Sequence, residues 1–243
     1  YGKGKKGGCD LFVVSTNKEK QTIVENFEYE PDEVINTGLP RWDVLKDKSQ
    51  GKREILIMPT WRNWLDSVPD KDFEESDYFR HYMGLLNSER LNQILEKYDL
   101  EVNFYLHAKF QEYADTFKSI SKRIHLISFG EVAVNEMLMR CRMLITDYSS
   151  VCWDILYQDK PSLFYQFDIE KYNEAHGSYI DMETELFGDR AATQEQLLDY
   201  LEETVQNDFR LKPEYEKMRG EYLQFKDHEH SRHICEEIKK RFH

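Results

Sequence analysis

The segment from Met143 to Tyr165 constrains the fold more than any other part of this 243-residue chain. Met143–Thr146 is a short apolar run of the strand type, and Ser162–Tyr165 is a second one. Apolar residues recur at helical spacing between them. Ser149 or Ser150 is suited to the N-cap of that helix, because a serine hydroxyl accepts a hydrogen bond from the first helical turn. The segment therefore predicts a strand, a helix and a second strand in succession.

The same alternation extends over residues 54–165, where apolar strand-like runs are separated by amphipathic helical patterns. This order predicts a parallel sheet with right-handed crossovers and helices on both of its faces, an α/β fold. We expect strands at 54–58, 102–106, 124–127, 143–146 and 162–165. We expect helices at 78–98 with a break near 87–88, and at 111–117, 132–141, 194–205, 213–225 and 230–242. Residues 168–187 are expected to be irregular.

The first part of the chain reads as the end of a different domain. Two short strands (10–15 and 34–37) and one helix (17–27) are expected there, after a glycine- and lysine-rich start. We therefore predict a remnant of a preceding domain with its linker at residues 1–45. A Rossmann-like domain is predicted at residues 46–243.

Composition narrows the classes of function. The net charge of −13 argues against a general nucleic-acid binder, although it permits a local basic site for a phosphorylated ligand. No apolar run approaches the roughly 20 residues that span a bilayer, and no signal-peptide pattern is seen at the start. The four cysteines are scattered without a Cys-x-x-Cys pair, which is typical of reduced thiols in a cytosolic protein and indicates no zinc site.

Polar residues follow several of the predicted strands directly. Thr60–Arg62 follows one strand, His107 follows the next, and Thr146–Ser150 lies at the end of a later one. Because parallel strands end at one edge of a sheet, we expect these residues on a common rim, where ligands of such sheets bind. Arginine suits phosphate charge, histidine suits a proton or a phosphate oxygen, and a helix start suits a diphosphate.

Each of these residues also has a purely structural interpretation. Arg62 at a strand end can be an ordinary surface residue, and Arg41 can pair with Asp43. His107 can be a satisfied histidine near the surface, and Asp154 can complement the dipole of its helix. The convergence of several such residues on one rim favours the functional interpretation.

The motifs on this rim resemble those of a known family. Leu-Ile-Thr-Asp-Tyr-Ser-Ser-Val (144–151), followed by Trp-Asp and then Lys-Pro-Ser-Leu-Phe-Tyr, is similar to the signature of CDP-glycerol glycerophosphotransferases. These are the teichoic-acid polymerases and primases of Gram-positive bacteria, with relatives in capsule synthesis. The family's other blocks are resembled, in the family's order, by residues 37–45, 58–62, 105–107 and 227–234.

The resemblance implies a GT-B-type fold, of which this chain is the carboxyl-terminal, nucleotide-binding half. The implied reaction transfers glycerol phosphate, or a related alditol phosphate, from CDP-glycerol to an acceptor hydroxyl and releases CMP. The implied acceptor is a polyol phosphate or a lipid-linked glycan, in teichoic-acid or capsule synthesis. We expect no cofactor and no obligatory metal, since none of the polar motifs after the predicted strands is an acidic metal-binding cluster of the Asp-x-Asp kind. We expect a cytoplasmic protein that reaches the inner face of the cell membrane peripherally, through upstream sequence or a partner.

The resemblance also assigns roles to residues. His107 is the expected catalytic residue, and with the arginines it stabilises charge on the diphosphate. Ser149 and Ser150 hold that diphosphate, and Asp154 bonds the ribose or cytosine side. The complete predicted set of substrate-binding residues is Arg41, Thr60, Trp61, Arg62, Tyr105, Leu106, Thr146, Ser149, Ser150 and Asp154.

Two departures from the family pattern shape the expected activity. The family's Trp-His-Gly block, whose histidine is the expected general base, has no counterpart in the sequence, and Ala108 stands where the family usually has proline. We therefore expect the chain alone to bind nucleotide but to turn over poorly. Two alternatives stay open: a GT-B glycosyltransferase that uses a nucleotide sugar, and a non-catalytic half-domain that serves assembly.

Overall fold

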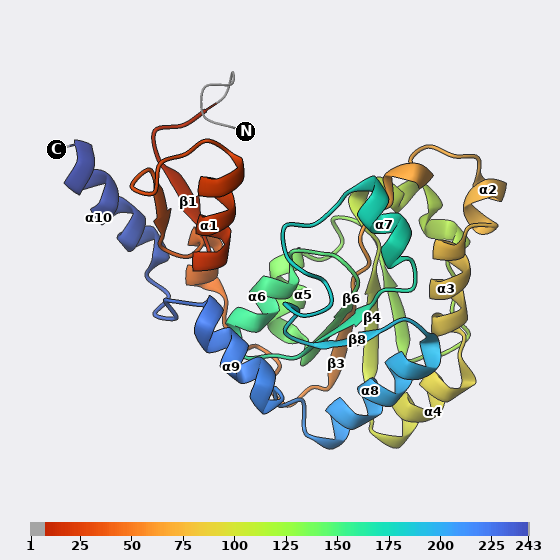
Figure 1. Cartoon of the computed structure of the whole chain (residues 1–243). Helices are drawn as coiled ribbons and strands as arrows, with labels where there is room; N and C mark the ends of the chain where they lie inside the picture. The colour runs from red at the N-terminus through yellow and green to blue at the C-terminus, as the bar shows by residue number, and fades with distance from the viewer. Residues whose placement is uncertain (1–7, 243) are drawn as a thin grey trace. The chain divides into compact units, whose positions relative to one another are not determined.

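The computed structural model describes residues 8–242, which form two compact units (Figure 1). Unit 1 comprises residues 1–46 and 212–243, and unit 2 comprises residues 47–211. The predicted glycine-rich connection at the start lies almost entirely outside the described residues. Within residues 8–242, no helix combines the length and the apolar character that crossing a membrane requires.

Unit 2 is built on a six-stranded sheet in which every neighbouring pair is parallel (Figure 1). The strand order is β5-β4-β3-β6-β7-β8. The strands are β3 (Glu54–Ile57), β4 (Glu101–Tyr105), β5 (Ile124–Ile127), β6 (Met143–Thr146), β7 (Ser162–Tyr165) and β8 (Asp189–Ala191). The order reverses between β3 and β6, so their carboxyl ends flank the position where ligands of open parallel sheets bind.

Helices cover both faces of this sheet, as the alternating pattern predicts. One apolar core joins α3, α4 and α8 to the sheet, whereas α5 packs on β3 and α6 packs on β6 and β7. The helical elements of unit 2 are η2 (Asn63–Leu65), α2 (Asp70–Glu74), α3 (Asp77–Leu86), α4 (Glu89–Lys97), η3 (Ala108–Thr116), α5 (Val134–Arg140), α6 (Cys152–Tyr157), α7 (Ile169–Ala175) and α8 (Gln194–Gln206). The parallel α/β fold expected from the sequence is confirmed.

Local sequence explains most helix boundaries. Ser76 and Ser88 cap α3 and α4, since each hydroxyl accepts a backbone N–H of the first turn, and the predicted break near residues 87–88 is confirmed. Thr193 and Gln196 form a capping box at the start of α8. The elements without a sequence prediction include α7 and β8, in or just after the stretch expected to be irregular, and the short helices η1 (Pro40–Val44), η2 and α2. β8 is a three-residue polar strand that exists through pairing with β7.

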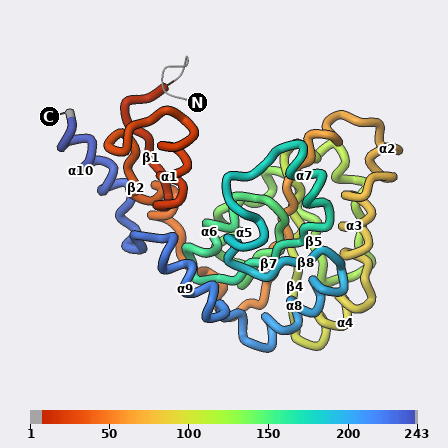
Figure 2. The backbone as a smooth tube through the Cα atoms, viewed as in Figure 1, coloured from red at the N-terminus to blue at the C-terminus, as the bar shows by residue number. Residues whose placement is uncertain are grey.

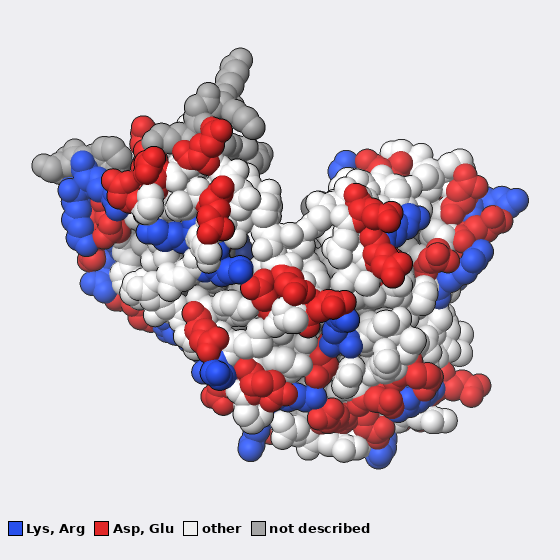
Figure 3. Space-filling model, in the orientation of Figure 1, with Lys and Arg blue, Asp and Glu red and all other residues white. Residues whose placement is uncertain are grey.

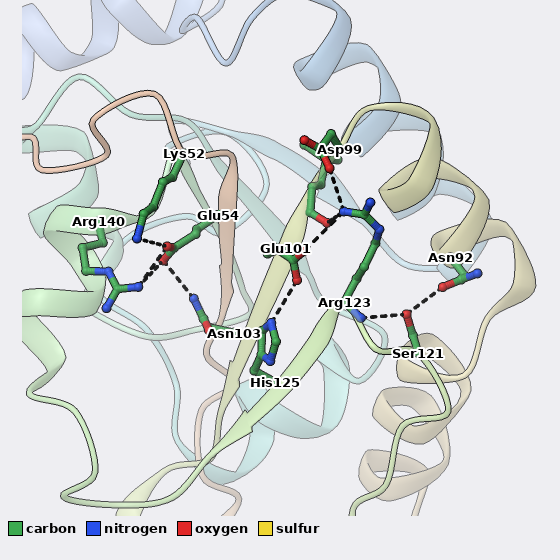
Figure 4. A network of polar contacts seen from close by, with 11 residues as sticks. Lys52, Glu54, Asn92, Asp99, Glu101, Asn103, Ser121, Arg123, His125 and Arg140 are labelled. Carbon is green, nitrogen blue, oxygen red and sulfur yellow. Dashed lines mark hydrogen bonds and ion pairs between the residues drawn. The ribbon is translucent and has the colours of Figure 1, made fainter.

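The amino ends of β3, β4 and β5 carry a polar network on the edge opposite the predicted rim (Figure 4). The Glu54 carboxylate accepts hydrogen bonds from Arg140 Nη2 at 2.9 Å and from Asn103 Nδ2 at 3.2 Å. On the adjacent strand, Glu101 Oε2 lies 2.9 Å from His125 Nε2. These hydrogen bonds and ion pairs neutralise the charge of both carboxylates within the protein. The network therefore has a structural role and links the three strands.

Unit 1 contains a two-stranded parallel sheet and the last two helices of the chain (Figure 2). Its core gathers Val14, Ile23, Tyr29 and Val34. Its elements are β1 (Phe12–Val14), α1 (Asn17–Asn26), β2 (Val34–Asn36), η1 (Pro40–Val44), α9 (Pro213–Tyr222) and α10 (His230–Phe242).

The carboxyl-terminal boundary differs from the prediction of a single domain over residues 46–243. Residues 212–243 group with unit 1, because Asp43 caps α10 there. Its two carboxylate oxygens accept the backbone N–H groups of His230 at 2.7 Å and Ser231 at 3.0 Å. The buried His230 ring also packs edge-on against Trp42. The hydrophobic pattern of a helix predicts which of its faces is buried, but it does not show which unit that face packs against.

Surface charge follows the composition. Figure 3 shows acidic and basic side chains interspersed over the face drawn, with acidic ones prevailing, as the net charge of −13 requires. Any site for an anionic ligand therefore needs a locally favourable environment in this anionic protein.

Candidate functional site

A fully buried carboxylate, Asp147, organises the carboxyl edge of the sheet in unit 2. It directly follows β6, and both of its oxygens accept two hydrogen bonds. Oδ1 accepts the backbone N–H of Thr60 at 2.8 Å and that of Tyr148 at 2.7 Å. Oδ2 accepts Arg62 Nη2 at 2.8 Å and the Tyr82 hydroxyl at 3.1 Å. Asp147 thereby fixes the loop after β3 to the turn after β6.

Arg62 extends this connection to the loop after β7. Its guanidinium is fully buried and donates to Asp168 through Nε at 2.7 Å and Nη2 at 3.1 Å. It also donates to Asp147, and Nη1 donates to the Thr60 carbonyl at 2.7 Å. Burial alone lowers the pKa of Arg62, but the two carboxylates outweigh it and raise that pKa well above its ordinary value. Arg62 is therefore permanently charged and holds three loops together.

This geometry changes the expected role of Arg62. A side chain with no exposed surface and with its donors engaged by protein oxygens offers nothing to a ligand. The prediction that Arg62 contacts the substrate, and the alternative that it is an ordinary surface residue, both give way to a positioning role. Asp147 and Asp168 were not among the predicted site residues. Asp168 lies in the stretch read as irregular, where no sequence signal marks it.

Aromatic rings enclose the Arg62 guanidinium on several sides. Its central carbon lies 4.9 Å from the ring centroid of Tyr148 and 5.3 Å from that of Tyr172. Those two tyrosine rings stack on each other at 3.6 Å, and the Tyr148 hydroxyl donates to Asp168 Oδ1 at 3.0 Å. Burial raises the pKa of Tyr148 far above its ordinary range, so its hydroxyl keeps its proton. Cation–π contacts in such a desolvated setting add rigidity to the rim.

The loop after β3 presents two polar atoms that this structure leaves without a hydrogen-bond partner. They are the hydroxyl of Thr60 and the indole N–H of Trp61, and both atoms are buried. A buried polar group without a partner costs about 1–3 kcal/mol, so native proteins rarely retain one without a reason. Five other buried side-chain atoms of the described residues share this state, so what distinguishes these two is their position beside His107 at the carboxyl edge.

His107 stands at the end of the adjacent strand, β4, and begins η3. Its Nδ1 accepts the backbone N–H of Lys109 at 3.2 Å, so the neutral ring carries its proton on Nε2. Burial, together with the positive charge of Lys109, holds the pKa of His107 below its ordinary value. The His107 ring stacks on that of Trp61, with centroids 6.4 Å apart and planes inclined by 23°. The side chain is thus a neutral hydrogen-bond donor beside the unsatisfied indole.

Ser149 and Ser150 lie in the turn between β6 and α6. The helix begins later than predicted, with Val151 at the N-cap, and Ser149 Oγ lies 3.5 Å from the Val151 nitrogen. The Ser149 side chain is partly exposed and Ser150 is exposed. Both hydroxyls are therefore accessible at the edge of the sheet where Thr60 also lies.

The other predicted residues are buried or belong to unit 1. Tyr105, Leu106 and Asp154 are each less than 5% exposed, and Thr146 is fully buried with its hydroxyl donating to the Met58 carbonyl at 2.7 Å. Tyr105 and Thr146 end β4 and β6, Leu106 follows β4, and Asp154 lies in the first turn of α6. Arg41 is exposed in η1 of unit 1. The carboxylate of Asp43 accepts backbone N–H groups of α10, as described above, so the alternative of an Arg41–Asp43 pair is not needed to satisfy it.

One group of potential metal ligands occurs within residues 8–242. It consists of Asp227, His230 and His233 in unit 1. In sequence, these residues are far from every predicted site residue of unit 2. His230 Nδ1 lies 2.8 Å from the Thr37 carbonyl, and His233 Nε2 lies 3.2 Å from Asp227 Oδ2. These contacts serve the start of α10.

Comparisons with known proteins place the chain in a family. A family model described as CDP-glycerol:poly(glycerophosphate) glycerophosphotransferase matches residues 3–240. The chain is 30% identical over 231 residues to the minor teichoic acid biosynthesis protein GgaB of Bacillus subtilis (strain 168), a match that covers 89% of this chain and 25% of GgaB. It is 26% identical over 254 residues to a teichoic acid glycerol-phosphate transferase of Staphylococcus aureus (strain NCTC 8325 / PS 47), covering 94% and 60%. The chain thus spans only part of these relatives.

Solved structures support the fold assignment. The wall teichoic acid polymerase TagF superposes with a TM-score of 0.72 at 20% identity, covering 96% of this chain and 59% of that one. A UDP-N-acetylglucosamine 2-epimerase superposes with a TM-score of 0.53 at 18% identity, covering 95% and 57%. At such identities the likeness shows the fold, which is GT-B-like, as expected from the motifs. Since the family model covers nearly the whole sequence, the chain belongs to the CDP-glycerol:poly(glycerophosphate) glycerophosphotransferase family.

Proposed function

We propose that the carboxyl edge of unit 2 binds the diphosphate of CDP-glycerol, or of a related CDP-alditol. In the proposed reaction, the alditol phosphate passes to an acceptor hydroxyl during teichoic-acid synthesis, and CMP is released. The observation that carries this proposal is the grouping of unsatisfied polar atoms of Thr60 and Trp61 with a neutral His107 on one edge. Membership of the family and the teichoic-acid relatives support the same substrate class.

His107 is proposed to stabilise charge on the diphosphate. With Nδ1 occupied by the Lys109 N–H, the proton on Nε2 can be donated to a phosphate oxygen as negative charge develops there. Accepting a proton from the attacking hydroxyl would require Nε2 to be unprotonated, which this hydrogen bond opposes. We therefore assign His107 a role in charge stabilisation, and the acceptor hydroxyl needs another group to remove its proton.

Ser149 and Ser150 are proposed to hydrogen-bond the diphosphate from the turn after β6. Asp147 and Arg62 keep that turn in register with the Thr60 loop, because they connect the two through buried hydrogen bonds. The reacting phosphorus would then lie between donors fixed on neighbouring loops, which is the arrangement that positioning and electrostatic stabilisation require. Reaction at the inner face of the cell membrane, with a polyol-phosphate or lipid-linked acceptor, is part of the same proposal.

Calorimetric titration with CDP-glycerol, CMP and UDP-glucose tests this function. We expect CDP-glycerol and CMP to bind and UDP-glucose not to. The double variant Ser149→Ala/Ser150→Ala should weaken CDP-glycerol binding about tenfold or more, since hydrogen bonds to charged groups contribute about 1.5–3 kcal/mol each. Ser121→Ala is the matched control, because its hydroxyl bonds Asn92 just before the amino end of β5.

The alternatives have distinct outcomes in the same titration. A preference for UDP-glucose would favour a glycosyltransferase that uses a nucleotide sugar. Unchanged CDP-glycerol affinity in the serine double variant would remove the diphosphate from this turn. No binding of any of the three ligands would favour a non-catalytic half-domain.

A further inference from the structure

Trp64 and His176, which have no part in the proposed diphosphate contacts, join Trp61 and His107 in an aromatic cluster. The His176 ring centroid lies 6.1 Å from that of Trp61 and 6.1 Å from that of Trp64. Trp61 is therefore flanked by the His107 ring and the His176 ring. The cluster assembles from the loops after β3, β4 and β7, which only the parallel sheet brings together.

Two lysines place positive charge against this cluster. The Nζ atom of Lys109 lies 5.4 Å from the ring centroid of Trp61, and that of Lys171 lies 4.9 Å from the ring centroid of Trp64. Lys109 has one distant carboxylate neighbour, Asp66, at 3.7 Å. Both ammonium groups are exposed, so a ligand anion can reach them.

The local backbone fixes His176 toward the end of α7. The helix ends there, because the N–H of His176 bonds the Tyr172 carbonyl at 2.9 Å and that of Gly177 bonds the Asn173 carbonyl at 3.0 Å. Gly177 has φ of +70°, a conformation that glycine adopts without strain and that closes helices. His176 is exposed, and it belongs to the element whose start, Asp168, is held by the buried Arg62.

We propose that this aromatic cluster, with Lys109 and Lys171, is a subsite for a polyol-phosphate chain, the end of which supplies the acceptor hydroxyl. The inference rests on the proposed function, which places the reacting diphosphate at His107. An acceptor hydroxyl must approach the phosphorus to roughly 3–3.5 Å, so its chain must lie next to His107. The indole faces bury the aliphatic carbons of a polyol, and the exposed cations neutralise its phosphodiester groups.

The proposed subsite differs from the proposed diphosphate site in the charge of its contacting groups. Its two lysine ammonium groups lie against partly buried indole rings, whereas the proposed diphosphate contacts are uncharged: hydroxyls, the Trp61 N–H and one neutral imidazole. A repeating anionic chain benefits from spaced cations because each phosphate contributes an equivalent charge. Lys171 and His176 are therefore assigned to acceptor affinity, and neither is assigned to CMP binding.

The test compares two probes on the full chain by calorimetry: a synthetic glycerol-phosphate hexamer and CMP. We expect Lys171→Ala/His176→Ala to weaken hexamer binding about tenfold or more, since it removes one cation and one donor. CMP affinity should change less than about twofold, which is within ordinary surface effects. Lys171→Arg should retain hexamer binding, because it keeps the positive charge.

The matched control is Lys122→Ala/His125→Ala, which removes the same two residue types from exposed positions just before and within β5. Figure 4 labels His125 on this strand. It should leave both affinities unchanged. Equal hexamer affinity in the Lys171/His176 variant and the unaltered chain overturns the proposal. So does a loss of CMP affinity in that variant, which would make the cluster a nucleobase site.

Titration of the unaltered chain with both probes distinguishes failure of the subsite from failure of the proposed function. Binding of CMP without the hexamer overturns the subsite and leaves the proposed function standing. Binding of the hexamer without CMP supports the subsite and removes the donor assignment. Binding of neither probe overturns both.

Discussion

At the scale of single residues, the rim depends on buried charges that never meet solvent. Arg62 and Asp147 are both fully buried and 2.8 Å apart, and Asp168 completes the group. Such a group is costly to desolvate and is stable only while every member is paired. Its value is positional, since it holds the loops after β3, β6 and β7 in fixed relation.

Replacing Arg62 with methionine should destabilise unit 2 by about 3–5 kcal/mol, because Asp147 and Asp168 would stay buried without their partner. Urea unfolding followed by tryptophan fluorescence measures this change. Adding Asp147→Asn should recover part of the loss, since one unpaired carboxylate is then removed.

Arg90 provides the control for that experiment. Its ion pairs with Glu195 and Asp199 are exposed, so Arg90→Ala should cost less than about 1 kcal/mol. Equal effects at Arg62 and Arg90 would contradict the positional role of the buried group.

His107 should titrate below the ordinary histidine pKa of about 6.5. Burial is the larger cause and the Lys109 ammonium the smaller, so Lys109→Ala should raise the pKa of His107 without restoring the ordinary value. As pH falls toward the lowered pKa, the unfolded chain takes up this proton before the folded one, and folding stability decreases. NMR titration of the imidazole measures the pKa. A pKa that stays unchanged in Lys109→Ala would refute the charge contribution, and Lys118→Ala is the control.

At the scale of elements, the chain closes on itself through α10. Asp43 accepts two backbone N–H groups at the start of this helix. Burial raises the pKa of its carboxyl, but hydrogen bonds from the side chain and backbone of Ser231 and from the backbone of His230 outweigh burial and lower that pKa. The lowered pKa means that this cap contributes stability above the ordinary pKa of aspartate and loses it as pH falls. The linker that precedes the sheet thus also completes unit 1.

Gly38 is the sharpest test of this packing. It has φ of +73°, and a Cβ atom there would overlap the His230 ring. Gly51 has φ of +81° with nothing within 4 Å of such a Cβ, so it is a matched control for backbone strain alone. Gly38→Ala should therefore destabilise unit 1 by at least about 1 kcal/mol more than Gly51→Ala destabilises unit 2.

Amide hydrogen exchange over β1 and β2 would measure the loss in unit 1, and exchange over β3 would measure that in unit 2. An equal loss of stability from the two substitutions would mean that the contact with His230 does not contribute to the stability of unit 1. The comparison is informative because both glycines share the left-handed conformation, and only one of them faces a side chain.

At the scale of the whole molecule, the described chain is one parallel α/β unit and one smaller unit built from both ends of the sequence. The site residues divide accordingly: all predicted residues other than Arg41 belong to unit 2. The proposed binding of CMP therefore falls to unit 2, and the chain matches only 25% of GgaB and 60% of the Staphylococcus aureus transferase.

Sequence alone determined the parallel sheet, its strands and the rim. Strand-like runs such as Met143–Thr146 are local patterns, and the βαβ rule converts their order into one shared carboxyl edge. The motifs also determined the family. His107 and the serines could be proposed for the same reason, because each directly follows a predicted strand.

Only the tertiary structure showed which polar residues of the rim are buried and hydrogen-bonded and which keep an unpaired polar atom. Arg62 and Trp61 are neighbours in one motif, yet one is sealed among carboxylates while the other keeps an unsatisfied N–H. The partners of Arg62 lie 85 and 106 positions away in sequence. His176, which contacts Trp61, ends a helix that the sequence pattern did not predict. Burial and pairing are properties of contacts between distant segments, so local sequence patterns do not specify them.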